Sequence, residues 1–332
     1  MRASRRARFV SFVLRHAFKP ILARAKDAQR ARAILNCGWF KTPTDVRITQ
    51  VTLGGIPGEW VECGFETGTG STVHDNGVRG SGRAELGTVE PVPVRVLLYL
   101  HGGGYFACSA RRHRPFTTAF AKRGFKVFAP NYRLAPENPF PAAVMDAVAA
   151  YRAVMPSVIA GDSAGGGLVL ATLVKLRDEG DALPAAVALF SPLTDLLGTG
   201  NSRRTNDERC AMFHGTGLAR GAEFYLCGAD PRDPLASPLY ADLKGLPPLL
   251  IHVGADETLL DDSTLVAERA RAAGVAVELT VWPVVPHVWQ LFHPYLPEGR
   301  QSLDAAAEFL RRAVAQAKGA STRFASRSLG RG

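Results

Sequence analysis

The feature that most constrains this chain is a regular alternation of short apolar runs with helix-like segments. The strand-like runs are 94–100, 125–129, 157–160, 185–190, 249–253 and 277–282, and the helix-like segments are 112–123, 139–153, 164–179, 261–273 and 301–318. Short buried strands that alternate with helices imply right-handed crossovers and a mostly parallel sheet with helices on both faces. The predicted fold class is therefore α/β, with ligands expected beyond the carboxyl ends of the strands.

Four stretches depart from this alternation. Residues 46–53 and 58–63 predict two strands around a turn rich in Gly and Pro. Residues 64–93 are rich in Gly, Ser, Thr and charge and have no periodicity, which predicts a long loop. Residues 196–234 carry no strand signal and predict an inserted helical piece. Residues 4–33 predict a helix.

The charge of the chain is concentrated at its two ends. Residues 1–32 hold ten Lys/Arg and one acid, a net charge of +9, and 311–332 have a net charge of +6, whereas 33–310 have a net charge of −5. A mildly acidic body argues against a nucleic-acid-binding core. The basic ends have two interpretations, solvated termini or contact of residues 1–32 with an anionic membrane surface. The apolar positions near one face of the first helix are Phe9, Phe12, Val13, Ala17, Ile21 and Leu22.

Cysteine usage and the N-terminus bear on the compartment. The five cysteines are odd in number and widely spaced, without a C-x-x-C pair, so a reducing cytoplasmic location is expected rather than a disulfide framework or a zinc site. The N-terminus begins like a signal peptide, but Arg15 and His16 end the apolar run after six residues. No stretch is long and apolar enough to predict a membrane span.

A candidate nucleophile follows the strand that ends at Ala160. The sequence Gly161-Asp-Ser-Ala-Gly165 matches G-x-S-x-G and leads directly into a helix. In that strand–turn–helix context the turn is so sharp that the hydroxyl of Ser163 is exposed. The helix N-terminus also favours developing negative charge. The alternative interpretation is a glycine-rich turn without catalytic function, such as a phosphate-binding loop.

A second glycine motif, His101-Gly-Gly-Gly-Tyr105, follows the strand that ends at Leu100. Acyl transfer creates an oxyanion, and HGGG loops supply backbone N–H groups to it in lipases and esterases. The simpler interpretation is a flexible loop. Two such motifs, each directly after a strand, favour the catalytic interpretation over that of flexible loops.

A base and an acid are expected in the order serine, acid, histidine. Asp256 and His287 each lie a few residues past a strand end and satisfy that order. Histidine accepts the serine proton near neutral pH, and a carboxylate fixes its tautomer. We choose Asp256 because it lies nearest the strand end. The rival acids are Glu257, Asp261 and Asp262, and the rival base is His293.

Together these motifs resemble the bacterial hormone-sensitive-lipase-like esterases of the α/β-hydrolase fold, over about Val94 to Leu310. Further matching segments are 131–137, 139–142, 191–195, 254–262 and 286–290. The resemblance implies Ser163 as nucleophile, His287 as base and Asp256 as its orienter, with an oxyanion hole of the backbone N–H groups of Gly103, Gly104 and Ala164. It also implies a helical cap.

The cap completes the expected domain organisation. Basic N-terminal cap helices are expected at 1–45, the hydrolase core at 46–195 and 235–318, an inserted cap segment at 196–234 and a basic flexible tail at 319–332. We expect the first helix to cover the acyl pocket with its apolar face buried. Phe106, Trp289 and Phe292 are the expected substrate-binding residues.

The predicted function is that of a serine carboxylesterase acting on small short- to medium-chain esters, without metal or cofactor. The alternatives are an amidase, lactonase or deacetylase with the same triad, and a non-catalytic small-molecule receptor on this fold. The oligomeric state stays open, a homodimer included.

Overall fold

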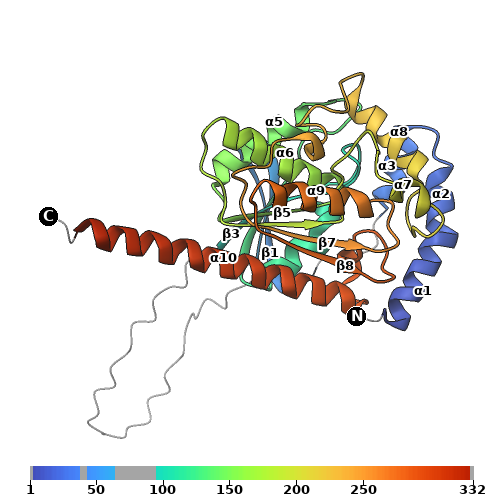
Figure 1. Cartoon of the computed structure of the whole chain (residues 1–332). Coiled ribbons are helices and arrows are strands. Elements are labelled where there is room, and N and C mark those ends of the chain that lie inside the picture. The colour runs from blue at the N-terminus through green and yellow to red at the C-terminus, as the bar shows by residue number, and fades with distance from the viewer. Residues whose placement is uncertain (1–2, 38–42, 64–94, 330–332) are drawn as a thin grey trace, which may run out of the picture.

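The computed structural model describes residues 3–37, 43–63 and 95–329, and only the backbone of 320–329. Its centre is one eight-stranded sheet in the order β1-β2-β4-β3-β5-β6-β7-β8 (Figure 1). The strands are β1 (Val46–Leu53), β2 (Ile56–Cys63), β3 (Arg95–Leu100), β4 (Phe125–Pro130), β5 (Val158–Asp162), β6 (Val187–Phe190), β7 (Leu249–Gly254) and β8 (Val277–Trp282). The predicted loop at 64–93 lies outside the described residues.

The predicted parallel sheet is confirmed, with one antiparallel edge. β4, β3, β5, β6, β7 and β8 pair in parallel, whereas β2 pairs antiparallel with both β1 and β4. β2 begins at Ile56, two residues earlier than expected, because Ile56 and Pro57 pair with Leu53 and Thr52 across a two-residue hairpin turn.

Helices cover both faces of the sheet. α5 (Ala142–Val154), α6 (Ala164–Asp178) and α9 (Leu260–Ala272) pack on one core, and α4 (Arg114–Ala121) and α10 (Pro297–Leu329) pack on the other. Alternate residues of β3 enter opposite cores, Leu98 and Leu100 the first and Leu97 and Tyr99 the second. This explains why the strands read as continuous apolar runs. α10 continues to Leu329, so most of the segment predicted as a flexible tail is helical.

Two further segments lie together at one end of the sheet (Figure 1). The N-terminal segment, residues 3–37, contains α1 (Arg5–Val13), a π-helical turn (Leu14–Phe18), α2 (Lys19–Ala23) and α3 (Ala28–Leu35). The insertion, residues 196–234, contains α7 (Ser202–Thr205) and α8 (Gly215–Leu226). The single helix expected at 4–33 is therefore interrupted, because Asp27 caps a new helix by accepting the Arg30 N–H at 2.8 Å.

Cations hold the N-terminal segment to its neighbours. Lys19, although buried, donates to the carbonyls of Asp207 and Cys210 in the insertion. In return, Arg220 donates to the Ala25 carbonyl at 2.7 Å. Arg32 donates to the Phe106 carbonyl at 2.7 Å and forms an ion pair with Glu137.

The orientation expected for the first helix is wrong. Ala7, Ser11 and Leu14 face the rest of the molecule, whereas Phe9 and Phe12 are 68% and 60% exposed. The buried face of the segment thus combines polar clamps and small residues with Leu14. Within the described residues no helix is both long and apolar enough to cross a membrane.

Candidate active site

Most of the sequence-predicted site residues line one cavity of about 190 Å³. Ser163, His287, Gly103 and Gly104 line it from the hydrolase core. The rest of its wall is mostly apolar and comes mainly from the N-terminal segment and the insertion. These wall residues include Leu14, Phe18, Leu22, Leu35, Met212, Phe213, Leu218 and Phe224. Both segments therefore cover the end of the sheet at which ligands of α/β proteins bind.

Ser163 occupies the sharp turn between β5 and α6. Its backbone has φ 51° and ψ −123°, a strained conformation for a residue with a side chain. The turn is held on both sides, because Ser163 N–H donates to the Phe190 carbonyl and its own carbonyl accepts from Leu193 N–H, each at 2.8 Å. The sharp, strained turn expected between strand and helix at this residue is confirmed.

The close approach of strand and helix explains a glycine in this turn. A Cβ atom on Gly165 would lie 2.1 Å from the Leu100 carbonyl oxygen and 2.5 Å from that of His101. Both contacts are with backbone, so no side-chain rotation could relieve them. Gly165 thereby lets α6 begin directly against the loop after β3.

The carboxylate on His287 is that of Glu257, and the prediction of Asp256 is wrong. His287 Nδ1 and Glu257 Oε2 are 2.6 Å apart, and both side chains are buried. Glu257 Oε1 also accepts from the Gly254 N–H at 2.6 Å and the Ser191 hydroxyl at 2.7 Å. Asp256 instead faces outward and lies 3.7 Å from Arg209.

The turn after β7 explains this exchange. Glu257 N–H donates to the Gly254 carbonyl at 3.1 Å, which folds the chain back over the end of the strand. The longer glutamate side chain then reaches inward, where it is 1% exposed and its two oxygens have three partners. The shorter Asp256 is left on the outer side of the same turn. The rivals Asp261 and Asp262 bind the insertion instead, through Ser202 and Arg203.

The second nitrogen of His287 is the informative one. His287 Nε2 is buried and has no hydrogen-bond partner among the described residues. The Phe213 ring from the insertion packs edge-on against this imidazole, with 5.0 Å between ring centroids. A buried polar nitrogen without a partner, in the wall of the cavity that Ser163 lines, is free to exchange a proton with a group in that cavity. The rival His293 is not among the residues that line it.

The loop after β3 contributes two glycines to the cavity wall. Gly103 has φ 118° and Gly104 has φ 63°, values that favour glycine. A Cβ atom on Gly103 would lie 2.2 Å from the Ala107 carbonyl oxygen. Within the described part of the chain, the N–H groups of Gly103, Gly104 and Ala164 have no acceptor. Gly103 and Gly104 line the cavity, and Ala164 directly follows Ser163.

A buried network beneath this loop was not predicted from the sequence. The carboxylate of Asp162 accepts from the Tyr99 hydroxyl at 2.7 Å and the Gly102 N–H at 3.0 Å, and lies 3.1 Å from His113 Nε2. Burial opposes the charge, but His113 and these hydrogen bonds outweigh it and lower the pKa of Asp162. Asp162, the neighbour of Ser163, is thus an anion that holds the glycine loop in place. The sequence signal that could have indicated this network is the acid Asp162 inside the G-x-S-x-G motif.

Two of the three expected substrate contacts lie at the cavity. Phe106 and Phe292 line it. Trp289 does not, so that prediction is wrong. Its ring is completely buried against Trp282, with centroids 5.5 Å apart, and its indole N–H donates to the Glu298 carbonyl. The Trp289 side chain thus connects the end of β8 with the start of α10.

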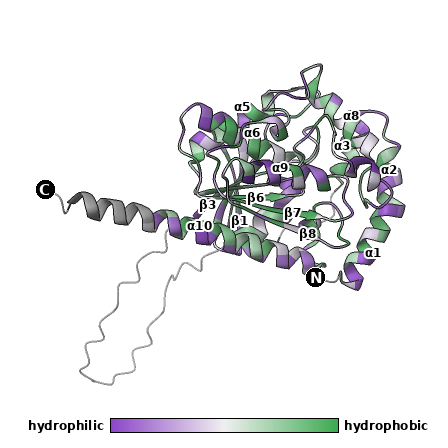
Figure 2. Cartoon of the chain, in the orientation of Figure 1, coloured by the Kyte–Doolittle hydropathy of each residue, from purple (hydrophilic) through white to green (hydrophobic). Residues whose placement is uncertain are grey.

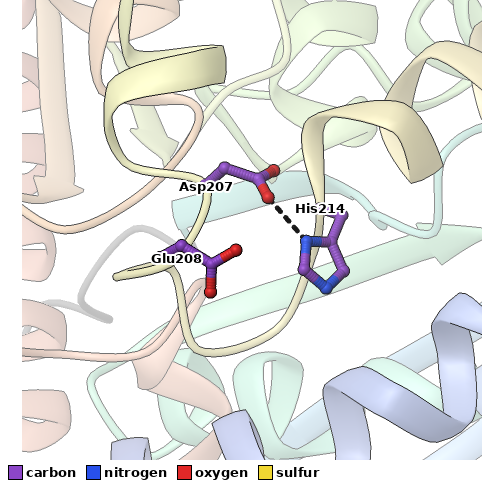
Figure 3. Close-up of side chains that lie close together, drawn as sticks. All are labelled: Asp207, Glu208 and His214. Carbon is purple, nitrogen blue, oxygen red and sulfur yellow. Dashed lines mark hydrogen bonds and ion pairs between the residues drawn. The ribbon is translucent and has the colours of Figure 1, made fainter.

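Asp207, Glu208 and His214 form one cluster with metal-ligand chemistry among the described residues (Figure 3). Asp207 Oδ2 lies 2.6 Å from His214 Nδ1, and Oδ1 accepts the Gly215 N–H at 2.6 Å. Both carboxylate oxygens of Asp207 are therefore used to fix the start of α8. The cluster thereby holds the part of the insertion from which His214 lines the cavity.

Comparison with known proteins agrees with this architecture. A model of the alpha/beta hydrolase fold matches residues 97–291. An acetyl-hydrolase of Streptomyces hygroscopicus is 48% identical over 230 residues, which are 67% of this chain and 77% of that protein. A crystal structure of EstE5 soaked with p-nitrophenyl butyrate is 39% identical, with a TM-score of 0.82, over 94% of this chain and 100% of that one.

A solved esterase of the bacterial hormone-sensitive lipase family is also similar, at 40% identity and a TM-score of 0.80 over 95% of this chain and 100% of that one. The fold and the site therefore define an α/β-hydrolase. Within that class, this chain belongs to the bacterial hormone-sensitive-lipase-like esterases, as its motifs predicted. It is a carboxylic ester hydrolase.

Proposed function

We propose that this esterase is a serine carboxylesterase in which Ser163 is the nucleophile, His287 the general base and Glu257 its orienter. One observation carries the proposal. His287 is bound to Glu257 through Nδ1 while its buried Nε2, in the wall of the cavity that contains Ser163, has no partner among the described residues. A neutral imidazole held in this way is ready to accept a proton from a serine hydroxyl.

The mechanism follows from these positions. Ser163 Oγ attacks the ester carbonyl carbon while His287 Nε2 takes the hydroxyl proton, and Glu257 stabilises the imidazolium that results. The oxyanion is stabilised by the N–H groups of Gly103, Gly104 and Ala164. His287 then protonates the leaving alcohol, which gives an acyl-enzyme. Deacylation repeats these steps with water as the nucleophile.

The cavity supports a small apolar acyl group as substrate. Its volume of about 190 Å³ accommodates roughly six water-sized groups. Its wall is mostly aliphatic and aromatic, so it favours a hydrocarbon chain over a charged group. We therefore propose esters of short to medium acyl chains. The N-terminal segment and the insertion supply much of this wall, which supports their assignment as a cap. The cytoplasmic location expected from the cysteines stays a prediction.

Two measurements test the nucleophile. Ser163→Ala is expected to lower kcat on a p-nitrophenyl ester by more than about 10⁴-fold with an unchanged circular dichroism spectrum. An organophosphate is expected to add one label to the peptide that contains Ser163. A label on Ser191 or Ser109 would contradict the assignment.

A substrate series tests the substrate class. Hydrolysis of p-nitrophenyl esters from acetate to laurate, with an N-acetyl arylamide beside them, is expected to peak at a short or medium chain and to be slow on the amide. The similarity to an acetyl-hydrolase favours the alternative of acetyl-group removal. Activity confined to acetyl substrates, or faster cleavage of the amide, would select that alternative.

A further inference from the structure

The outer face of the N-terminal segment carries an unusual concentration of exposed apolar side chains. Nine large apolar side chains are exposed among the described residues, and four of them lie between residues 9 and 21. These four, which we call the apolar ridge, are Phe9, Phe12, Val13 and Ile21, with exposures of 68%, 60%, 40% and 53%. Exposed apolar side chains gathered in one segment mark an interaction site.

The ridge is exposed because the opposite face of the segment holds it in place. Ser4 binds Glu298 through its N–H at 2.7 Å and its hydroxyl at 3.1 Å, and Lys19 binds the insertion. Ala7 and Leu14 are buried between these anchors. The segment therefore cannot rotate to bury the ridge without breaking the clamps. α1 and α2, which carry the ridge, lie along the edge of the molecule (Figure 1).

The same segment also exposes cations. Arg5, Arg6, Arg8, Arg24 and Lys26 are exposed within the same segment. Hydrophilic and hydrophobic residues accordingly mix along α1 in Figure 2. A helix that presents aromatic and aliphatic side chains among arginines has the composition of helices that lie in a lipid–water interface. Exposed Tyr295, whose carbonyl accepts from Arg6, adds another aromatic ring of the kind enriched there.

The charge distribution selects among possible occupants. Residues 1–32 have a net charge of +9, whereas residues 33–310 have a net charge of −5. A symmetric contact between two copies would bring two such cationic segments together, which is unfavourable. An anionic lipid surface instead complements the arginines and accepts the apolar side chains below its head groups.

We propose that the N-terminal segment docks this esterase on anionic lipid bilayers, with the apolar ridge inserted at the boundary between head groups and acyl chains. The segment then has two separate faces. Its outer face contacts lipid, and its inner face, through Leu14, Phe18 and Leu22, lines the cavity. Docking through the ridge leaves the inner wall of the cavity intact, because none of the four ridge residues lines it.

Flotation with vesicles tests this proposal on the full chain. The protein is expected to float with phosphatidylglycerol/phosphatidylcholine vesicles and at least about tenfold less with phosphatidylcholine alone. Phe9→Ser with Phe12→Ser is expected to weaken binding to the anionic vesicles by about tenfold or more. The matched control, Met145→Ser with Met155→Ser, removes two exposed apolar side chains at α5 and is expected to bind like the parent.

The soluble-ester activity of both double variants, without vesicles, is expected to equal that of the parent. If the phenylalanine variant fails to fold, Arg5→Gln with Arg8→Gln keeps both rings and is expected to bind about tenfold more weakly. The proposal is overturned by absence of flotation, by equal binding to both kinds of vesicle, or by unchanged binding of these variants. A parent dimer that Phe9→Ser with Phe12→Ser converts to monomer would also overturn it, since the ridge would then be a subunit interface.

Discussion

At the scale of single residues, the buried polar side-chain atoms of the site have hydrogen-bond partners, except at the nitrogen that we propose exchanges a proton. Glu257 uses both oxygens to hold the end of β7, Ser191 and His287. Asp162 uses both to hold the loop after β3. Only His287 Nε2, among the polar atoms of these three side chains, is buried without a partner in the described structure. The orientation of the imidazole is thus fixed before any substrate binds, which limits the reorganisation that the reaction requires.

Replacing each of the two adjacent acids, Glu257 and Asp256, by its amide distinguishes their roles. Glu257→Gln is expected to lower kcat by about 10⁴-fold, because the amide nitrogen would face Nδ1 and leave the imidazole in the wrong tautomer. Asp256→Asn, which changes an outward-facing side chain beside Arg209, is expected to stay within about twofold of the parent. Initial rates on one p-nitrophenyl ester measure both. The opposite order of effects would show that Asp256 acts on His287 after a rearrangement.

That Ser163 and His287 lie at one cavity could be predicted because motif, strand context and chain order agree on them. The acid could not be chosen, since Asp256 and Glu257 lie in one turn and no periodicity separates them. Their difference is set by the Gly254 amide and the Ser191 hydroxyl, which only Glu257 reaches. These groups come from the ends of two neighbouring strands, and local sequence does not reveal such contacts. Trp289 was misassigned for a similar reason, because it lies near His287 in sequence but behind it in space.

At the scale of elements, periodicity predicted the sheet and its flanking helices but not the orientation of the N-terminal segment. A periodic pattern identifies the apolar face of a helix, and burial of that face is only the usual outcome. Here, buried Lys19 and half-buried Arg32 bind carbonyls of other elements and determine which face turns inward. Long-range bonds from cations to backbone therefore outweigh the apolar pattern in this segment.

Removing one of these clamps tests their importance. Lys19→Met keeps the aliphatic stem but removes the donor to the Asp207 and Cys210 carbonyls. We expect the free energy of unfolding to fall by about 1–3 kcal/mol and KM to rise several-fold, with labelling of Ser163 by a small organophosphate little changed. Lys26→Met, at an exposed position of the same segment, serves as the control. Equal effects of the two substitutions on stability and KM would argue against the clamp.

At the scale of the whole molecule, buried and half-buried histidines make stability depend on pH. Burial lowers the pKa of His252 to about 3 and that of His293 to about 4, and burial beside His113 lowers the pKa of His101 to about 3. The unfolded chain binds these protons near pH 6.5, so it is favoured as the pH falls below that value. Asp262 acts in the opposite direction between about pH 6 and 4, since burial raises its pKa to about 6.

The balance of these groups predicts acid sensitivity. Between pH 6 and 5, where ordinary carboxyl groups stay ionised in the unfolded chain, three histidines against Asp262 give a net uptake of about two protons on unfolding, so the free energy of unfolding is expected to fall by about 2–3 kcal/mol over that pH unit. Urea unfolding at several pH values measures this slope. His252→Asn, which can preserve a hydrogen bond to Ser302, is expected to reduce the slope by about one proton. An unchanged slope would show that His252 already titrates normally in the folded protein.

The clamp between Lys19 and the carbonyl of Asp207 also fixes an order of assembly during translation. Its two partners are 188 residues apart, so Lys19 waits roughly 10–40 s after its own synthesis for Asp207 to be made. During that interval Leu14, Phe18 and Leu22 have none of their cavity neighbours from the insertion. The inner face of this segment therefore stays uncovered by the insertion during that interval, in addition to its outer face. Because Glu257 and His287 are made later still, a chain arrested before His287 is expected to have no esterase activity.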